Sequence, residues 1–254
     1  MGLFVSEDRN YDESVRQVGF NRYKQLLSAH FGDWFKVNLL TILGALPLAA
    51  GIVFSILSSS VLVLIPSALV GGMIFGPFLA GMYDAVLRGM RDDPHHWWEN
   101  YRRSWKQNFR SSLLPGAILG LFLGMYAFMG MLFWWAETPP TAGTIVLYLV
   151  SGSALLLICT LYWPQMVLFE QRTVDRIRNM ILFTTKYLWK MLGVSLLQMG
   201  YWGIYVLFAP WTLLLVPIFG VWYIVFLSLH LIYDPLNTEL EIEERIQAAE
   251  QEYK

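Results

Sequence analysis

Five polar side chains sit in otherwise apolar stretches, and they are the residues of this chain that could do chemistry: Asn38, Asp84, Arg88, Gln165 and Gln198. An ionisable group inside a bilayer is a candidate for ion coupling, and an amide can bind a neutral solute or a neighbouring helix. Asp84 and Arg88 stand four residues apart, so they can pair along a helix. Because no apolar stretch carries a carboxylate at its centre, the pattern argues against an ion-driven pump. The three amides are typical of hydrogen bonds between helices.

Segment 94–110 combines aromatic rings with cations. Its rings recur every four positions, so they share one face of a helix, which basic residues flank. This pattern is typical of a helix that lies at the headgroup level of a membrane. It is also typical of a docking platform for a partner, since aromatic and Arg side chains dominate interface hot spots. Both interpretations stay open for Trp97, Trp98, Tyr101, Arg102, Arg103, Trp105, Lys106, Phe109 and Arg110.

We expect no catalytic, cofactor or metal site. His95 and His96 would point about 100° apart on a helix, so they cannot readily share an ion, and no cysteine lies near them. The sequence has no nucleophile elbow, no phosphate-binding glycine loop and no paired carboxylates in an apolar setting. The net charge of −1 gives no indication of nucleic-acid binding. The prediction is therefore a protein that is not an enzyme.

Long apolar segments must position these residues. Hydrophobic residues make up 56% of the chain, and Asp, Glu, Lys and Arg are absent from 37–83, 111–136, 138–169 and 191–233. One crossing needs about 20 apolar residues, so the first and last blocks hold two helices each and the middle blocks one each. We predict an all-α polytopic membrane domain over 1–233. Its six transmembrane helices are expected at about 35–57, 61–87, 112–135, 144–169, 191–208 and 211–233.

The distribution of charge predicts the topology. All 18 Lys and Arg residues lie in four segments, 9–36, 88–110, 172–190 and 245–254. Six crossings place these segments on one face of the membrane, which the positive-inside rule identifies as cytoplasmic. Both termini are then cytoplasmic. We expect amphipathic cytoplasmic helices at about 18–33, 94–110 and 173–190, and an acidic cytoplasmic helix at 234–254.

Small residues form stripes on the second and third predicted transmembrane helices. Such stripes let two helix backbones approach closely, and close packing is the expected role, with a pore lining as the alternative. The residues are Gly72, Gly76, Pro77, Gly81, Gly116, Gly120 and Gly124.

An aromatic residue followed by a base precedes three of the apolar runs, at 35–36, 109–110 and 189–190. The recurrence predicts three repeats, each an amphipathic helix followed by a transmembrane hairpin. Alternatively, it reflects the general preference for such residues where a helix enters a bilayer.

The motifs GPFLAGMY at 76–83, RGMRDD at 88–93, WKQNFR at 105–110 and WFKVNLL at 34–40 resemble the YesL-like family of bacterial integral membrane proteins. That family is a domain of unknown function. The resemblance covers the first half by motif and the second half by helix count and length, and the chain departs from it at 95–98 and in its acidic tail. It implies a multi-pass protein of the bacterial cytoplasmic membrane, often encoded beside carbohydrate importers. It brings no agreed ligand-binding residues.

The leading hypothesis is a non-enzymatic accessory, assembly or regulatory partner of a carbohydrate ABC importer. Its partners are then the lipid bilayer and importer subunits, and a homo-oligomer stays open. The alternative is a small transporter or channel for a neutral solute such as a sugar or glycoside. In that case Trp134, Trp135, Trp202 and Tyr205 would stack on the solute and Gln198 would hydrogen-bond it.

Overall fold

The computed structural model describes residues 19–93 and 96–253, with side chains up to residue 248. The N-terminal arm, residue 18 of the first amphipathic segment, residues 94 and 95 of the second, and Lys254 lie outside the described residues. Every regular element in the described part is helical, which confirms the predicted all-α class. In order these are α1 (Gly19–Leu57), α2 (Val61–Met90), α3 (Trp97–Trp135), α4 (Ala142–Leu168), α5 (Thr173–Lys186), α6 (Leu188–Leu207), η2 (Trp211–Leu215), α7 (Gly220–Leu240) and α8 (Ile242–Tyr253).

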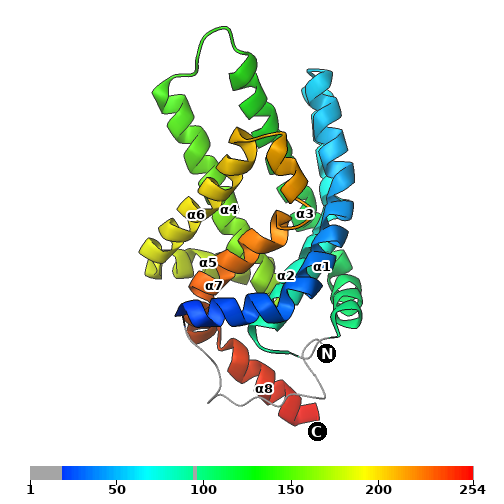
Figure 1. Cartoon of the computed structure of the whole chain (residues 1–254), viewed down its shortest axis with the longest axis vertical. Helices are drawn as coiled ribbons and strands as arrows, with labels where there is room; N and C mark the ends of the chain where they lie inside the picture. Colours follow the sequence, from blue (N-terminus) through cyan, green and yellow to red (C-terminus); the bar gives the residue numbers. More distant parts are fainter. Residues whose placement is uncertain (1–18, 94–95, 254) are drawn as a thin grey trace.

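Two long hairpins, α1–α2 and α3–α4, dominate the molecule (Figure 1). Two of the three amphipathic segments expected as separate helices, 18–33 and 94–110, are instead continuous with the apolar helices, because α1 and α3 each run unbroken for 39 residues, whereas the third is the separate helix α5. Neither α1 nor α3 has a helix-ending Pro or a capping turn at the point where the apolar run begins. The first part of α1 lies across the base of the molecule before the helix turns upward (Figure 1).

The third hairpin is shorter and broken. Helices α5 and α6 meet at Tyr187 with a bend of 100°. The predicted helix from about residue 211 begins only at Gly220, after the short helix η2. Pro210 and Pro217 flank η2, and a proline removes a backbone donor and clashes with the preceding turn. The turn between α6 and α7 lies well below the ends of the other two hairpins (Figure 1).

Four helices, α1 to α4, are long and apolar enough to cross a membrane, and α5 with α6 would make a fifth if counted as one bent span. The length and composition of these helices are consistent with the predicted helical membrane protein. The sixth span and the threefold repeat remain predictions. The tail also differs from expectation, because α7 continues through Pro235 to Leu240, and Glu241 (φ 51°) separates it from α8.

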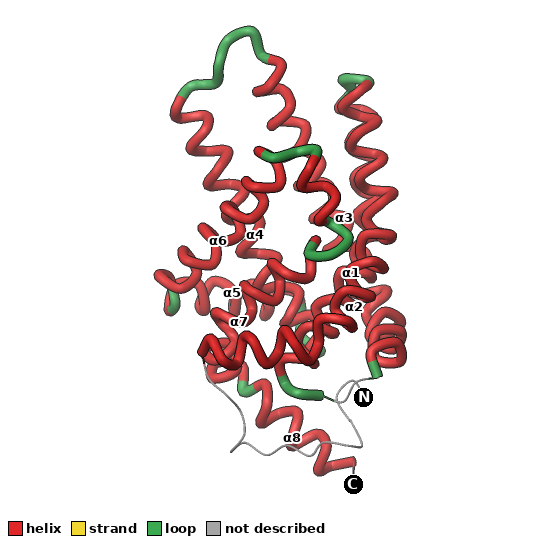
Figure 2. The backbone as a smooth tube through the Cα atoms, viewed as in Figure 1, coloured by secondary structure: helices red, strands yellow, loops and turns green. Residues whose placement is uncertain are grey.

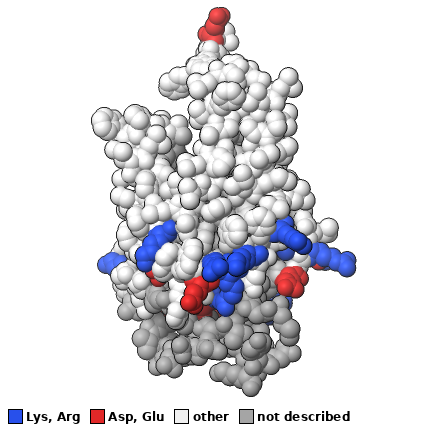
Figure 3. Space-filling model, turned by 90° about the vertical axis from the view of Figure 1, so that its right-hand side faces the viewer, with Lys and Arg blue, Asp and Glu red and all other residues white. Residues whose placement is uncertain are grey.

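Positive charge is confined to one end of the surface in the view of Figure 3. The Lys and Arg side chains of 22–36, 88–110 and 172–190 gather at one level, which we call the charged belt (Figure 3). Above it the surface in this view is uncharged except for an acidic side chain at the far end. Figure 2 shows that helices fill this uncharged part, joined by short turns. The molecule therefore has the polarity of a protein embedded in a bilayer.

Helices α2 and α3 pack backbone to backbone through glycines. A Cβ atom added at Gly116 would lie 2.8 Å from the Cα of Gly76, and one at Gly120 would lie 2.6 Å from the Cα of Gly72. Gly124 faces Ala68 in the same interface. The glycines of the two predicted stripes thus meet each other. Close approach without side chains is how helices gain packing contacts where lipid replaces water.

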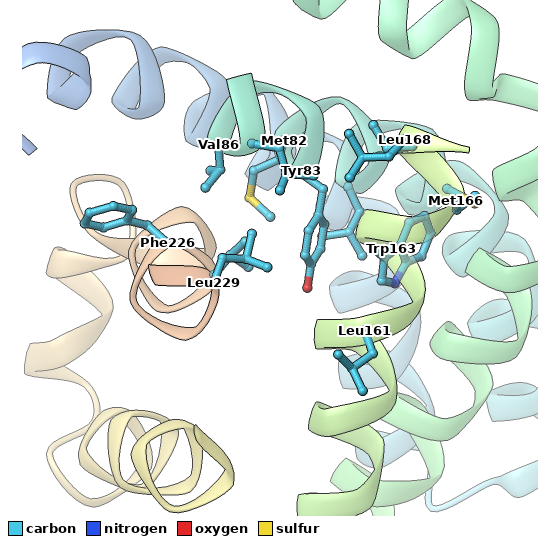
Figure 4. Close-up of a cluster of buried hydrophobic side chains, with 14 of the residues drawn as sticks. Met82, Tyr83, Val86, Leu161, Trp163, Met166, Leu168, Phe226 and Leu229 are labelled. Atoms are coloured by element: carbon cyan, nitrogen blue, oxygen red, sulfur yellow. The ribbon is translucent and has the colours of Figure 1, made fainter. Parts of the chain in front are cut away.

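A second cluster of buried side chains joins α2, α4 and α7 (Figure 4). The ring of Tyr83 stacks near Trp163, with centroids 6.3 Å apart. The residues that the figure labels are Met82, Tyr83, Val86, Leu161, Trp163, Met166, Leu168, Phe226 and Leu229. This cluster fixes the end of α2 that carries the charged residues.

Candidate functional site

Four charged side chains are buried where α2 ends, which makes this the most distinctive polar site of the described chain. Asp84 is 0% exposed, Arg91 1%, Arg88 4% and Asp93 7%. Arg88 Nε donates to Asp84 Oδ2 at 2.9 Å, the pair that their spacing predicts. Arg91 Nη2 donates to Asp93 Oδ2 at 3.1 Å. Two carboxylates and two guanidinium groups balance, as burial requires, because an unpaired buried charge is strongly destabilising.

The turn after α2 folds these groups together. The backbone N–H of Asp93 donates to the Arg88 carbonyl at 3.1 Å, and that of Asp92 donates to Gly89 at 3.2 Å. Asp92 adopts a left-handed conformation (φ 58°), which reverses the chain there. Cations in and just after the last helical turn also interact favourably with the helix dipole. The short run 88–93 thus builds most of the cluster by itself.

Arg22 of α1 holds this turn from outside. Its guanidinium group donates to both carboxylate oxygens of Asp92, at 3.1 and 2.6 Å, and to the carbonyl of Met90 at 2.9 Å. Such a bidentate contact is among the stronger kinds of ion pair. The start of α1 is therefore locked to the end of α2. We call the set Arg22, Asp84, Arg88, Arg91, Asp92 and Asp93 the ionic core.

A small cavity adjoins the ionic core between α1, α2 and α3. It has room for about 30 Å³ of solvent, enough for one or two water molecules. Trp34 forms part of the cavity wall, and its Nε1 donates to the Ala85 carbonyl at 3.2 Å. Lys36 lies 5.0 Å above the ring of Trp97 and connects α1 to α3 beside the opening. The lining of the cavity also includes His30, Asp33, Arg88, Asp93 and Asn100.

Some atoms of the ionic core keep unused hydrogen-bonding capacity. Asp84 Oδ1 and Arg91 Nε and Nη1 are buried without a partner among the described residues. No group of three or more His, Cys, Asp and Glu in the described ranges is arranged to hold a metal ion. The arrangement can bind water and fix helix ends. Sequence reasoning singled out Asp84 and Arg88 but missed the other four members of the ionic core, Arg22, Arg91, Asp92 and Asp93. The available signal was the dense charge run that directly follows an apolar span.

The aromatic face of α3 turns partly inward. Tyr101 is only 4% exposed, and its ring fills the space beside Gly81. Trp105 packs edge-on against Phe78 of α2, with centroids 5.9 Å apart. Trp97 is half-buried under Lys36. These rings hold α3 to the protein.

The other side of the same segment faces outward. Trp98 and Phe109 are exposed, as are Arg102, Lys106 and Arg110. Arg103 is half-buried, and its Nη2 donates to Asn100 Oδ1 at 2.9 Å. Outward contacts of this helix thus depend on cations and two rings rather than on the whole predicted aromatic face.

Gln198 connects three helices inside the apolar region. Its Nε2 donates to Thr160 Oγ1 of α4 at 2.7 Å and to Ser228 Oγ of α7 at 2.8 Å. Its Oε1 is buried without a partner in the described structure. Gln165 instead bonds within its own helix, to the Leu161 carbonyl at 3.0 Å. The two glutamines therefore play different parts.

The side chain of Asn38 hydrogen-bonds the irregular backbone between η2 and α7. Its side-chain amide donates to the carbonyls of Val216 and Pro217, at 3.0 and 2.9 Å, and accepts from the N–H of Val221 at 3.1 Å. Tyr201 donates to the Gly220 carbonyl at 2.7 Å. Irregular backbone at membrane depth must be satisfied by protein groups, and these side chains do so.

The aromatic residues of the transporter hypothesis fall in two places. Trp202 and Tyr205 belong to one ring cluster on α6, with centroids 5.7 Å apart, and Tyr201 joins it. Trp134 and Trp135 are exposed at the end of α3 farthest from the charged belt. The four rings thus do not form one site.

Fold and site together define a polytopic, all-helical membrane protein with a buried ionic core at its charged end. Comparisons of the chain with protein-family models, with curated proteins and with solved structures gave no match.

Proposed function

We propose that this protein is a non-enzymatic accessory subunit of the bacterial cytoplasmic membrane, serving a carbohydrate ABC importer in its assembly or regulation. The observation that carries the proposal is the second apolar face of α5. Val174, Ile177 and Ile181 lie three to four residues apart and are all exposed, while Met180 and Phe183 on the other side are buried. An amphipathic helix normally needs only one buried face. The exposed one is available to a partner.

The position of α5 supports contact with a membrane-embedded partner. It lies in the charged belt and bends by 100° into α6, so it runs across the bundle rather than along it. Exposed Trp189 lies in the first turn of α6, just after the bend, and exposed Trp98 lies in the first turn of α3. Rings and cations at one level fit both headgroups and the rim of an interface.

The link to carbohydrate import rests on resemblance. The motifs at 76–83 and 105–110 resemble the YesL-like family, whose members are often encoded beside carbohydrate importers. The belt supports a cytoplasmic location for the charged end and for both termini. Helices α1, α3 and α5 all start at the belt and lead into hairpins, which supports a threefold repeat, with the third hairpin shortened.

Photo-crosslinking in native membranes tests the docking face. A crosslinking amino acid at Ile177 or Trp98 should capture importer subunits, which mass spectrometry identifies. Leu147 of α4 is 72% exposed and apolar but lies away from the belt, so it is the matched control. Equal capture from Leu147, or purification of the protein alone in mild detergent with no crosslink, would overturn the proposal.

A second candidate is a transporter for a neutral solute, which one specific observation favours. Gln198, whose Oε1 has no partner in the described structure, precedes Trp202 by one turn of α6, and Trp202 contacts the rings of Tyr201 and Tyr205. A sugar uses ring faces and amide acceptors in this way. Proteoliposomes containing only this protein should then take up sugar, and Gln198→Leu should abolish uptake.

A further inference from the structure

An open hollow lies on the outward side of α3 within the charged belt. It is shallow and wide open, and the side chains that line it are Glu99, Arg102, Arg103, Lys106 and Gln107. Three of these five carry positive charge and only one is negative. Among the described residues none of the three cations forms a salt bridge, although other cations of the belt do. Positive charge therefore exceeds negative charge in this lining.

The cations are held in place by the rest of the helix. The opposite side of this segment is buried through Tyr101, Ser104 and Asn108, so the backbone beneath the hollow is fixed. Arg103 is oriented by Asn100, and its Nε is buried without a hydrogen-bond partner. The cations that a phosphate can reach are therefore the exposed side chains of Arg102 and Lys106, and both guanidinium and ammonium groups bind phosphate oxygens.

Beyond exposed Arg110, the same helix exposes apolar side chains. Leu114 is 67% exposed and Ile118 is also exposed. Leu114 lies eight residues beyond Lys106, which is about 12 Å along a helix. A molecule that fits both parts has an anionic head and long hydrocarbon chains.

We propose that this hollow binds the phosphate headgroup of an anionic phospholipid, with its acyl chains lying along Leu114 and Ile118. Arg102 and Lys106 contact the phosphate, Arg103 adds positive charge beside them, and Glu99 limits how far the headgroup extends toward the start of α3. The site is separate from the apolar face of α5, so it does not depend on the accessory function.

Lipid retention tests the site. The protein is placed in nanodiscs of equal parts phosphatidylglycerol and phosphatidylcholine, transferred to mild detergent, and its bound lipids are counted by native mass spectrometry. We expect wild type to retain phosphatidylglycerol preferentially. The triple variant Arg102→Gln, Arg103→Gln, Lys106→Gln should lower that preference at least tenfold, since one surface cation is worth about fivefold. The single variant Arg102→Gln should lower it about fivefold, and it serves if the triple variant does not fold.

A second triple variant controls for overall charge. Lys24→Gln, Arg178→Gln, Lys190→Gln removes three exposed cations elsewhere in the belt and should leave the preference unchanged. Equal losses in both triple variants would overturn the proposal. So would equal retention of phosphatidylcholine, or displacement of the lipid by millimolar inorganic phosphate, which would identify the site as one for free phosphate.

Discussion

The side chain of Asn38 lies directly against the backbone of Gly220. A Cβ atom added at Gly220 would be only 2.7 Å from Asn38 Oδ1, so the glycine gives the amide access to the start of α7. Through this contact a single side chain of the first helix satisfies the broken backbone of the last hairpin.

Replacing Asn38 with Leu should destabilise the protein by about 2–4 kcal/mol, because two carbonyls and one N–H lose their partner in an apolar environment. Unfolding in mixed detergent micelles measures the change. Gln165→Leu is the matched control, since that amide is bonded only within its own helix, and its effect should stay below about 1 kcal/mol. Similar losses for both variants would contradict the role of Asn38.

Because Arg22 forms a bidentate salt bridge with Asp92, the conservative substitution Arg22→Lys should not preserve the stability of the protein. Arg22→Lys should destabilise the protein nearly as much as Arg22→Gln, by about 1.5–3 kcal/mol, because lysine cannot bond both carboxylate oxygens and the Met90 carbonyl together. A double-mutant cycle with Asp92→Asn should give a coupling energy above about 1 kcal/mol. Full stability of Arg22→Lys would show that charge alone holds the turn.

The glycine contact between α2 and α3 predicts a strong position effect. Gly116→Ala should destabilise the bundle by about 1–3 kcal/mol or more, since the added methyl group meets backbone atoms of Gly76. Gly200→Ala on α6 meets nothing within 4 Å and should be neutral or slightly stabilising. The same unfolding assay compares them, and equal effects would argue against backbone contact.

The short third hairpin predicts poor access to its tip. In a Cys159→Ala background, a cysteine at Ala209 should react with an impermeant thiol reagent much more slowly than one at Ser58 or Thr138, because the tip lies below the ends of the other hairpins (Figure 1). Labelling of intact cells measures this. Equal labelling at all three positions would instead support six full spans.

The contact between the α5–α6 bend and α7 predicts a dependence on pH. Hydrogen bonds from Lys186 and Tyr187 lower the pKa of Glu239 below its ordinary value of 4.5. A carboxyl group whose folded pKa is depressed stabilises the fold above its unfolded pKa and loses that effect as pH falls through the folded pKa. Glu239→Gln should therefore unfold more readily than wild type at neutral pH, and the difference should vanish well below pH 4.5.

Apolar blocks and charge segregation were sufficient to predict an all-helical membrane protein and the boundaries of α2 and α4 to within a few residues. Glycine spacing predicted which residues allow close packing, although not that the two stripes meet each other. The continuity of α1 through Phe35 and of α3 through Phe109 was less predictable, because the side chains of a helix can change from polar to apolar while its backbone stays helical.

The third hairpin and the ionic core could not be predicted from local sequence patterns. Residues 191–233 contain enough apolar side chains for two spans, but Pro210 and Pro217 break the second one. Only the tertiary bond from Asn38 shows how that break is tolerated. Arg22 lies 70 residues from Asp92, and no local sequence pattern around either residue predicts their salt bridge.

The reach of Asn38 also constrains how the protein is made. Its partners lie 178 residues or more further along the chain. During synthesis the side-chain amide of Asn38 therefore lacks these partners until residues 216 and 217 have left the ribosome. Insertion of α7 then completes the bundle. A chain truncated before residue 216 would leave Asn38 of α1 without these hydrogen-bond partners.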